Sequence, residues 1–295
     1  MPIKTKIRTL IKDLFLNDFS WRLLSIFLKR IPYTSFLREQ VIKEKKQKVI
    51  DFHFKDLLIK DGIFKGIKYP KLISSGSAIY PKLLGSYECE LTKVFEQFFS
   101  EPLTTIIDIG CAEGYYLVGF AKKKASLKMI GVDISEMALS QTKQMLIENQ
   151  IDLSRISLYK AFNINLIPTG INDRVLIICD CEGYEDEIFK DDLSSAFNNC
   201  ILLIECHDFI IPNITERLAK ALTLTHQIEI IQTVSESTKL NFIPTEMSQL
   251  SFNDKLSLLN EGRPTSMNWI YANPHNNNKN FINEFNCVSN DSIKL

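Results

Sequence analysis

The sequence lacks the segments that mark membrane-spanning and secreted proteins. Among its 295 residues, no apolar run reaches the ~18–20 residues that a membrane-spanning helix needs. The N-terminus interleaves charged residues every few positions, so we expect no secretory signal. The seven cysteines are an odd number, and most lie in apolar runs, where a free thiol packs as a small hydrophobic side chain. A reducing cytoplasm is therefore the expected compartment.

The net charge is zero, but the basic and acidic residues are unevenly distributed along the chain. Lys and Arg total 35, as do Asp and Glu. Residues 1–50 carry 12 basic against 4 acidic side chains, whereas residues 101–295 carry 16 against 25. The acidic body argues against nucleic-acid binding there. The basic N-terminal arm leaves open an anionic partner such as lipid headgroups, RNA or an acidic glycan.

The spacing of apolar residues divides the chain into three segments. Residues 1–60 are predicted to form a helical extension, because apolar residues recur at steps of three and four over 3–30 and a charged helix follows over 36–60. We interpret residues 3–30 as a cap on the body, with a helix lying at a membrane surface as the alternative. Residues 273–295 are Asn-rich and are predicted to be a flexible tail.

Between these ends, residues 61–272 are predicted to form the main domain. A loop-rich lead-in and a helix occupy 61–100, and short apolar strands then alternate with helices. The predicted strands cover residues 104–109, 128–133, 156–161, 174–180, 201–206, 227–233 and 267–272. Such alternation indicates a parallel sheet covered on both faces. The expected fold is α/β, with a Rossmann-like, seven-stranded, mostly parallel sheet.

A glycine-containing turn follows the first predicted strand. Gly110 allows a sharp turn after Asp108, and Gly114 allows a ligand or the sheet to approach the next helix closely. Open parallel sheets bind ligands at the carboxyl ends of their strands. Asp133, 25 residues after Asp108, ends the second strand, where a carboxylate accepts hydrogen bonds from ribose hydroxyls. A nucleotide cofactor is therefore expected at this edge.

The same turn distinguishes between two cofactors. A nicotinamide site needs the fuller Gly-x-Gly-x-x-Gly series, whose free helix N–H groups hold pyrophosphate. Here residue 112 is alanine, and Glu113 stands where the anion would lie. A carboxylate repels pyrophosphate but suits the ammonium and sulfonium charges of S-adenosylmethionine (SAM). The sequence therefore favours SAM, with an NAD(P)-dependent oxidoreductase as the alternative.

At these residues the chain resembles class I SAM-dependent methyltransferases. The string Asp180-Cys181-Glu182-Gly183-Tyr184-Glu185 is similar to the FkbM-type branch, many of whose members O-methylate sugars or other hydroxylated metabolites. It departs from that branch at Cys181 and Tyr184, where Val and Ala are commoner. The resemblance implies a cofactor site made of Asp108, Gly110, Cys111, Glu113, Gly114, Asp133, Ile134, Phe162 and Asn163. The last three would contact the adenine.

Acidic side chains and a histidine follow the fourth and fifth predicted strands. Asp180 and Glu182 lie beside the methyl-transfer position of this fold, and strand alternation predicts that they share one side. Either could be the general base that removes a hydroxyl proton. His207 is a third candidate, because its unperturbed pKa lies near neutrality. The expected reaction is O-methylation of a small-molecule acceptor such as a sugar or glycan.

No metal ligand is assigned from the sequence. Hard oxygen atoms of the kind that Mg²⁺ prefers are present in Asp180, Glu182, Glu205 and Asp208. Zinc is disfavoured, because Cys179 and Cys181 lie in an apolar strand and no second pair has standard spacing. Three further acids, Glu185, Asp186 and Glu187, are interpreted as first-turn residues of the next helix.

One further function stays open. The chain could be a non-catalytic protein that keeps the methyltransferase fold and docks through its basic arm. The sequence indicates neither the acceptor atom, be it oxygen, nitrogen or carbon, nor the oligomeric state. The Glu261–Arg263 string before the last strand has no role that the sequence explains.

Overall fold

The computed structural model describes residues 32–189 and 194–275. The chain divides into two compact units, Met1–Asp56 with Ile243–Asp254 and Leu57–Phe242 with Lys255–Leu295. The amphipathic segment expected over residues 3–30 lies outside the described residues, as does most of the expected tail. Within the described part, no helix has both the length and the apolarity needed to cross a membrane.

The first unit contains the expected charged helix. Helix α3 spans Pro32–His53 and ends earlier than predicted. Gln47 donates a hydrogen bond to Asp51 one turn later, at 2.8 Å. Lys46 Nζ lies 2.6 Å from Asp254 Oδ2, so this basic helix has an acidic partner from the returning segment of its own unit.

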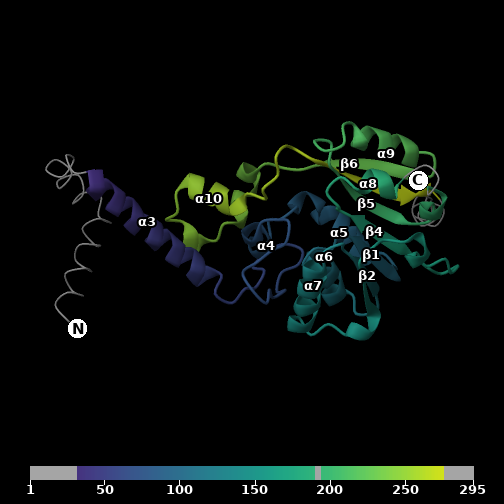
Figure 1. The fold of residues 1–295 in the computed structure, drawn as a ribbon, viewed down its shortest axis with the longest axis horizontal. Helices are drawn as coiled ribbons and strands as arrows, with labels where there is room; N and C mark the ends of the chain where they lie inside the picture. Colours follow the sequence, from purple (N-terminus) through teal and green to yellow (C-terminus); the bar gives the residue numbers. More distant parts are fainter. Residues whose placement is uncertain (1–31, 190–193, 276–295) are drawn as a thin grey trace, which may run out of the picture. The chain divides into compact units, whose positions relative to one another are not determined.

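The second unit contains a seven-stranded sheet of order β3-β2-β1-β4-β5-β7-β6 (Figure 1). Its strands are β1 Thr105–Ile109, β2 Lys128–Val132, β3 Ile156–Tyr159, β4 Val175–Cys179, β5 Ile201–Cys206, β6 His226–Gln232 and β7 Asn268–Pro274. The first five are parallel, and β7 runs antiparallel to both of its neighbours. The expected mostly parallel Rossmann-like sheet is therefore confirmed. The strand order reverses between β1 and β4, which is where such sheets bind ligands.

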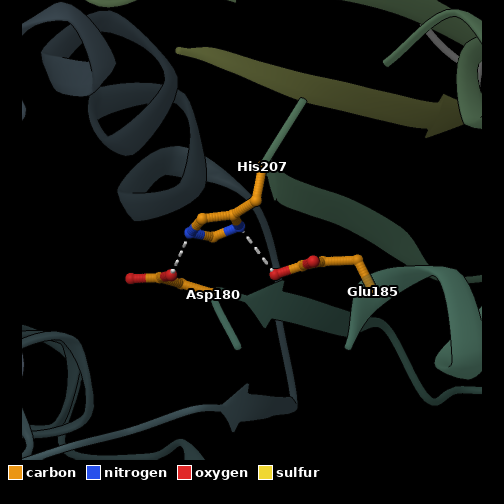
Figure 2. Close-up of side chains that lie close together, drawn as sticks. All are labelled: Asp180, Glu185 and His207. Atoms are coloured by element: carbon orange, nitrogen blue, oxygen red, sulfur yellow. Dashed lines mark ion pairs between the residues drawn. The ribbon is translucent and has the colours of Figure 1, made fainter. Parts of the chain in front are cut away.

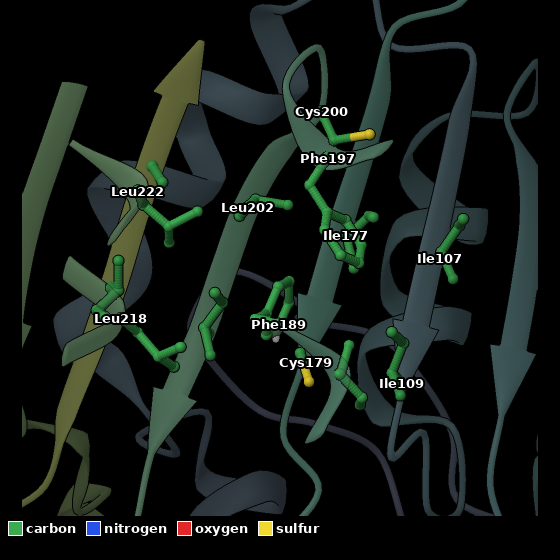
Figure 3. Packing of buried hydrophobic residues seen from close by; sticks show 14 of the residues in the cluster. Ile107, Ile109, Ile177, Cys179, Phe189, Phe197, Cys200, Leu202, Leu218 and Leu222 are labelled. Carbon is green, nitrogen blue, oxygen red and sulfur yellow. The ribbon is translucent and has the colours of Figure 1, made fainter. Parts of the chain in front are cut away.

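Both faces of the central strands are buried. β1, β4 and β5 are buried along their whole length, because helices cover the two sides. On one face, Ile107, Ile177 and Leu202 pack against Leu218 of α9 and against Phe197 (Figure 3).

The opposite face is rich in aromatic rings. Tyr116 of α6 lies 6.4 Å from Trp269 of β7 between ring centroids. Phe120 of α6 lies 5.5 Å from Phe95 of α5, and Phe64 of the lead-in lies 5.6 Å from Phe120. Because successive strand residues point to opposite faces, Asp108 is directed to this aromatic side, and its neighbours Ile107 and Ile109 belong to the cluster on the other.

The helices agree with the sequence in the regular part and differ around it. They are α4 Ile79–Leu84, α5 Thr92–Ser100, α6 Tyr115–Lys123, α7 Glu136–Glu148, α8 Glu185–Ile188, α9 Ile214–Leu222 and α10 Phe252–Leu259. The helix expected over 184–197 is wrong in extent, since α8 has four residues and a separate turn covers Ser194–Phe197. Helices α4 and α10 were not expected. Pro81 lies in the first turn of α4, where a proline is tolerated, so its presence did not exclude a helix.

Two glycines bring the ends of the lead-in together. Lys60 N donates to Leu83 O at 2.8 Å, which fixes the segments side by side. Gly62 and Gly85 both have positive φ, of +73° and +83°. A Cβ atom on Gly85 would overlap the carbonyl oxygen of Asp61, and one on Gly62 would overlap that of Gly85.

Gly85→Ala is therefore expected to destabilise the protein more than an alanine at another positive-φ glycine. Gly66→Ala is the matched control, because its φ is +88° but nothing lies within 4 Å of its Cβ position. The control should lose ~1 kcal/mol, and Gly85→Ala ~2–3 kcal/mol or more. Urea unfolding measures both values, and equal losses would contradict the close approach.

Candidate active site

The turn between β1 and α6 is shaped by contacts that admit only glycine. Gly110 has φ +82°, and its N–H donates to Val132 O at 2.8 Å. A Cβ atom there would overlap the carbonyl oxygen of Asp180, so the turns after β1 and β4 are pressed together. Gly114 has φ +91°, and its Cβ would lie 2.9 Å from Thr142 Cγ2. Gly110 thus makes the sharp turn expected after the first strand, and the close neighbour of Gly114 is Thr142 of α7.

Asp133 binds this turn through backbone amides. Its Oδ2 accepts from Ala112 N at 3.0 Å, and its Oδ1 accepts from Ser135 N at 2.8 Å. Ser135 in turn caps α7 by accepting from Ala138 N at 3.2 Å. Beside it, the Ile134 residue is 91% exposed. The end of β2 therefore presents a fixed carboxylate next to an uncovered apolar side chain.

Asp108 is buried without full compensation. It is 2% exposed, and its Oδ2 has no hydrogen-bond partner. Burial raises its pKa to about 7, and a hydrogen bond from the Leu117 amide opposes that rise. A buried acceptor atom that lacks a donor is costly. Such an atom suits a ligand that brings positive charge.

Glu113 bonds to the lead-in segment. Its carboxylate lies 2.6 Å from Lys82 Nζ and accepts from Tyr69 OH, Ser74 Oγ and Ser75 N at 3.1, 2.8 and 3.0 Å. Burial by itself would raise the pKa of Glu113, but the Lys82 ammonium and these donors hold it below its usual value. Its negative charge is thus compensated within the protein.

The other three residues expected in the cofactor site, Cys111, Phe162 and Asn163, contact neighbouring residues of the protein. Cys111 is buried, with Sγ 4.0 Å from Thr142 Oγ1. Phe162 is half-buried and stacks on Phe197 at 6.3 Å between ring centroids. Asn163 is exposed, and its Oδ1 accepts from Asn165 N at 2.9 Å.

The three proposed catalytic side chains, Asp180, Glu182 and His207, lie close together. Figure 2 shows His207 between Asp180 and Glu185. Its Nδ1 lies 3.0 Å from Glu185 Oε1. Its Nε2 faces three other carboxylates, with Asp180 Oδ1 at 3.7 Å, Glu182 Oε2 at 3.5 Å and Glu205 Oε2 at 3.7 Å. Four acids, from the turn after β4, from the first turn of α8 and from β5, thus surround one imidazole ring.

We call His207 and its four acids, Asp180, Glu182, Glu185 and Glu205, the His207 cluster. Its members differ in solvent exposure. The His207 side chain is 2% exposed, that of Asp180 25% and that of Glu182 68%. Burial raises the pKa of Asp180 to about 7 and raises that of Glu205 above its usual range. Burial would lower the pKa of His207, but the surrounding carboxylates, Glu185 first, raise it above its usual value.

Sequence reasoning missed the role of Glu185. It does lie in the first turn of α8, as expected, but it is fully buried and its carboxylate meets the imidazole. Its Oε1 also accepts from Cys181 N at 3.0 Å. Its neighbour Asp186 behaves as expected for a first-turn acid, since it pairs with Arg217 at 2.7 Å near the surface. In the sequence, the only sign of this contact is that acids recur through residues 180–185.

Arg263, in the Glu261–Arg263 string before β7, forms ion pairs with three carboxylates. Its guanidinium bonds to Glu88 Oε1 at 2.6 Å, to Glu261 Oε2 at 3.0 Å and to Glu205 Oε1. These carboxylates come from the lead-in, from the loop before β7 and from β5. Lys239, which is buried, adds a second cation against Glu261. Arg263 therefore links the His207 cluster, through Glu205, to the segments that surround it.

Residues 100–240 match the family model described as a methyltransferase domain. This part of the chain is a methyltransferase domain. No curated protein shows a significant match to this sequence.

Solved structures show distant similarity to the methyltransferase domain and its surroundings. The O-methyltransferase TomG from Streptomyces achromogenes, involved in tomaymycin synthesis and solved with SAM, is 12% identical, with a TM-score of 0.42, over 69% of this chain and 83% of its own. Precorrin-8w decarboxylase from Methanobacterium thermoautotrophicum is 12% identical, with a TM-score of 0.41, over 61% and 88%. An rRNA methylase from Streptococcus thermophilus is 12% identical, with a TM-score of 0.40, over 62% and 96%.

Arg263→Ala is expected to destabilise the protein strongly, because it leaves buried carboxylates without their cation. Loss of one partner of a buried ion pair costs ~3–5 kcal/mol. Arg217→Ala is the matched control, since its pair with Asp186 is solvent-accessible and should be worth less than ~1 kcal/mol. Equal denaturation midpoints for the two variants would refute this assignment of Arg263.

Proposed function

We propose that the protein transfers a methyl group from SAM to a hydroxyl group of a small molecule. The observation that carries the proposal is the pairing of two unlike sites at adjacent strand ends. Buried Asp108, with an unpartnered oxygen, lies before the glycine turn of β1. The His207 cluster lies at the ends of β4 and β5. One site suits a cationic cofactor, and the other suits proton removal from an acceptor.

The cofactor half of the proposal rests on how the residues at the ends of β1 and β2 fit SAM. Asp108 would face the ammonium group, and Gly110 and Gly114 would leave room along the turn. Asp133 would accept from the ribose hydroxyls, and exposed Ile134 would cover the adenine. SAM, when bound, supplies a methyl group on a positively charged sulfur. The protein's own contribution is then to hold the cofactor and orient the acceptor.

For Glu113 we propose a positioning function, in place of direct contact with the cofactor. Its bonds to Lys82 and to the lead-in hydroxyls hold the turn on which Gly110 and Gly114 lie. Cys111 would contribute backbone only, because its side chain is buried. Phe162 and Asn163 stay candidates for the adenine side.

The acceptor half of the proposal places Asp180 next to the reacting groups. Its backbone carbonyl abuts Gly110, and its side chain is partly exposed, whereas the His207 side chain is nearly covered. We therefore assign proton removal to Asp180, with His207 and Glu185 as positioning residues behind it. Glu182, which is more exposed, would contact the acceptor.

The charge of the His207 cluster also bears on the acceptor. Asp180, Glu182, Glu185 and Glu205 surround one imidazole, so an anionic acceptor would be repelled. A neutral hydroxylated molecule, such as a sugar, fits better. An assignment to the FkbM-type branch and a cytoplasmic location belong to the same proposal.

Isothermal titration calorimetry tests the proposal. The wild-type protein should bind SAM or its demethylated product, and Asp108→Asn should weaken binding at least tenfold, because a charged contact to the ligand is lost. Asp152→Asn, a change at an exposed turn, is the control and should bind normally. Binding of NAD(P) with no binding of SAM would contradict the proposal.

The Asp108→Asn variant should also become more stable relative to the wild type as pH rises. The folded pKa is about 7 and the unfolded one ~3.9, so the folded wild type keeps a proton that the unfolded chain loses. Wild-type stability therefore falls from about pH 4 to pH 7, by up to ~4 kcal/mol at 1.36 kcal/mol per unit of pKa shift. The variant lacks this loss, so its advantage grows over that window. Urea unfolding at pH 5 and pH 8 measures it, and a constant difference would count against the raised pKa.

Asp180→Asn should slow turnover while SAM binding persists. Removal of a general base lowers kcat by ~10²–10⁴-fold. The control is Asp186→Asn, which alters an acid of the adjoining helical turn that pairs with Arg217. The rate of methyl transfer is measured with a panel of hydroxylated acceptors, and the affinity for SAM is measured on the same variants. Full activity of Asp180→Asn would remove Asp180 from the mechanism.

A further inference from the structure

Two thiols lie next to each other at the end of β4, with Asp180 between them in the sequence. Cys179 is the last residue of the strand, and Cys181 follows in the turn. Their Sγ atoms are 3.5 Å apart. A disulfide bond needs a sulfur–sulfur distance of ~2.05 Å, so the two atoms have to approach by only about 1.5 Å for a bond to form.

The two sulfur atoms differ in their access to solvent. Cys179 is fully buried in the core cluster shown in Figure 3, whereas Cys181 is half-buried and packs against that cluster. Burial raises the pKa of the Cys179 thiol well above its ordinary value. Because the thiolate is the reactive form of cysteine, an oxidant from solvent reacts first at Cys181. Cys179 then lies in contact with the product.

Other buried cysteines have different surroundings. Cys200 and Cys206 are buried, and the sulfur atom of each contacts a backbone carbonyl oxygen at 3.9 Å. Both therefore fit the expectation that a free thiol packs as a small hydrophobic side chain. The contact between Cys179 and Cys181 joins two sulfur atoms, and it gives this pair a chemistry that a single buried thiol lacks.

We propose that Cys179 and Cys181 are an oxidative modification site, which hydrogen peroxide converts to a disulfide bond. In the first step the Cys181 sulfur takes one peroxide oxygen, the O–O bond breaks, and one water molecule leaves, so that a sulfenic acid forms. In the second step the Cys179 sulfur attacks that sulfur and the S–O bond breaks. The proton of Cys179 leaves with the hydroxyl group as a second water molecule. The two thiols together lose two electrons, which the peroxide accepts.

The short ring makes the modification reversible. The disulfide would enclose only one intervening residue, Asp180, and so small a ring is strained. Strained disulfides are the readily reduced ones. Transient disulfides of this kind occur in reducing compartments, where they act as redox sensors. A dithiol reductant reverses the step, because it returns both thiols and itself becomes a disulfide.

The modification acts on the proposed catalytic residues, and this part of the inference rests on the proposed function. Cys179 is anchored in the core, so Cys181 has to move when the bond forms. The Cys181 amide donates to Glu185 Oε1 at 3.0 Å, and the Asp180 carbonyl abuts Gly110. A shift of Cys181 therefore disturbs both the carboxylate behind the imidazole and the turn that holds the assigned base. Misplacement by ~1 Å can slow a reaction about 100-fold.

Peptide mapping of the full chain tests the site without SAM or acceptor. The reduced protein is treated with a stoichiometric amount of hydrogen peroxide, and its free thiols are then alkylated under denaturing conditions. Trypsin releases residues 175–190 as one peptide that contains both cysteines. In the wild type this peptide should be unalkylated and lighter by two hydrogen atoms than the reduced form. Treatment with dithiothreitol before alkylation should restore both alkylation sites.

Two variants separate the two steps, and Cys200→Ala is the matched control. Cys181→Ser should leave Cys179 reduced, because the thiol that meets the oxidant is gone. Cys179→Ala should stop at the Cys181 sulfenic acid, which dimedone traps. Cys200→Ala removes a buried thiol whose sulfur contacts a carbonyl, and it should form the disulfide like the wild type.

Methyl transfer before and after oxidation tests the effect on activity. The wild type and Cys200→Ala should each lose at least ~tenfold in rate after peroxide treatment and recover with dithiothreitol. Cys181→Ser should keep after treatment the rate that it had before. Equal losses in Cys181→Ser and the wild type would refute control of the site by this pair.

Two results of the peptide mapping would overturn the modification site itself. One is a wild-type peptide 175–190 that stays fully alkylated after peroxide treatment, and the other is a bond from Cys181 to a different cysteine. SAM titration of the reduced protein reports separately on the proposed function. A protein that forms the disulfide but binds no SAM would support the modification site and refute the methyltransferase proposal.

Discussion

The close contact between the turns after β1 and β4 is the constraint on which the candidate site depends. Because Gly110 has no side chain, the carbonyl of Asp180 reaches the backbone of the first turn. Asp180 N also donates to Ile109 O at 2.9 Å, so the two turns are joined as well as adjacent. The parallel pairing of β1 with β4 sets this contact. As a result, the proposed cofactor turn and the His207 cluster share one edge of the sheet.

A second constraint is the compensation of buried negative charge. Two buried acids are paired with basic side chains: Glu113 with Lys82, and Glu261 with Arg263 and Lys239. The four acids of the His207 cluster share one imidazole, and their other bonds come from Arg263 to Glu205 and from the Cys181 amide to Glu185. Uncompensated charge therefore concentrates at Asp108 and around Asp180. These are the places where a ligand would improve the electrostatics.

The sheet could be predicted from sequence because its signal is local. Each buried strand is a short apolar run and each helix follows at a regular interval, so strands such as Ile201–Cys206 were found at their true bounds. The glycine turn and Asp133 could be predicted for the same reason. Residues whose function depends on partners far along the chain could not be predicted in this way. By its sequence position, Glu185 is an ordinary acid in the first turn of a helix. Only the structure shows that its carboxylate contacts His207.

Helix α4 and the string at Arg263 illustrate the same limit. α4 contains Pro81 and ends at Gly85, so its composition resembles that of a loop. Its stability comes from the burial of Leu83 and Leu84 and from the close approach at Gly62. Arg263 lies in an irregular segment, and its three carboxylate partners are spread from Glu88 to Glu261. No local pattern encodes such a meeting of segments.

The ion pair between Lys82 and Glu113 has a consequence for where the catalytic unit begins. The family match starts at residue 100, yet Glu113, in the first turn of that region, takes its cation and its hydroxyl donors from residues 69–82. A chain shortened to the matched region would bury a carboxylate with no counter-charge beside the cofactor turn. The lead-in is thus an inseparable part of the domain that it precedes.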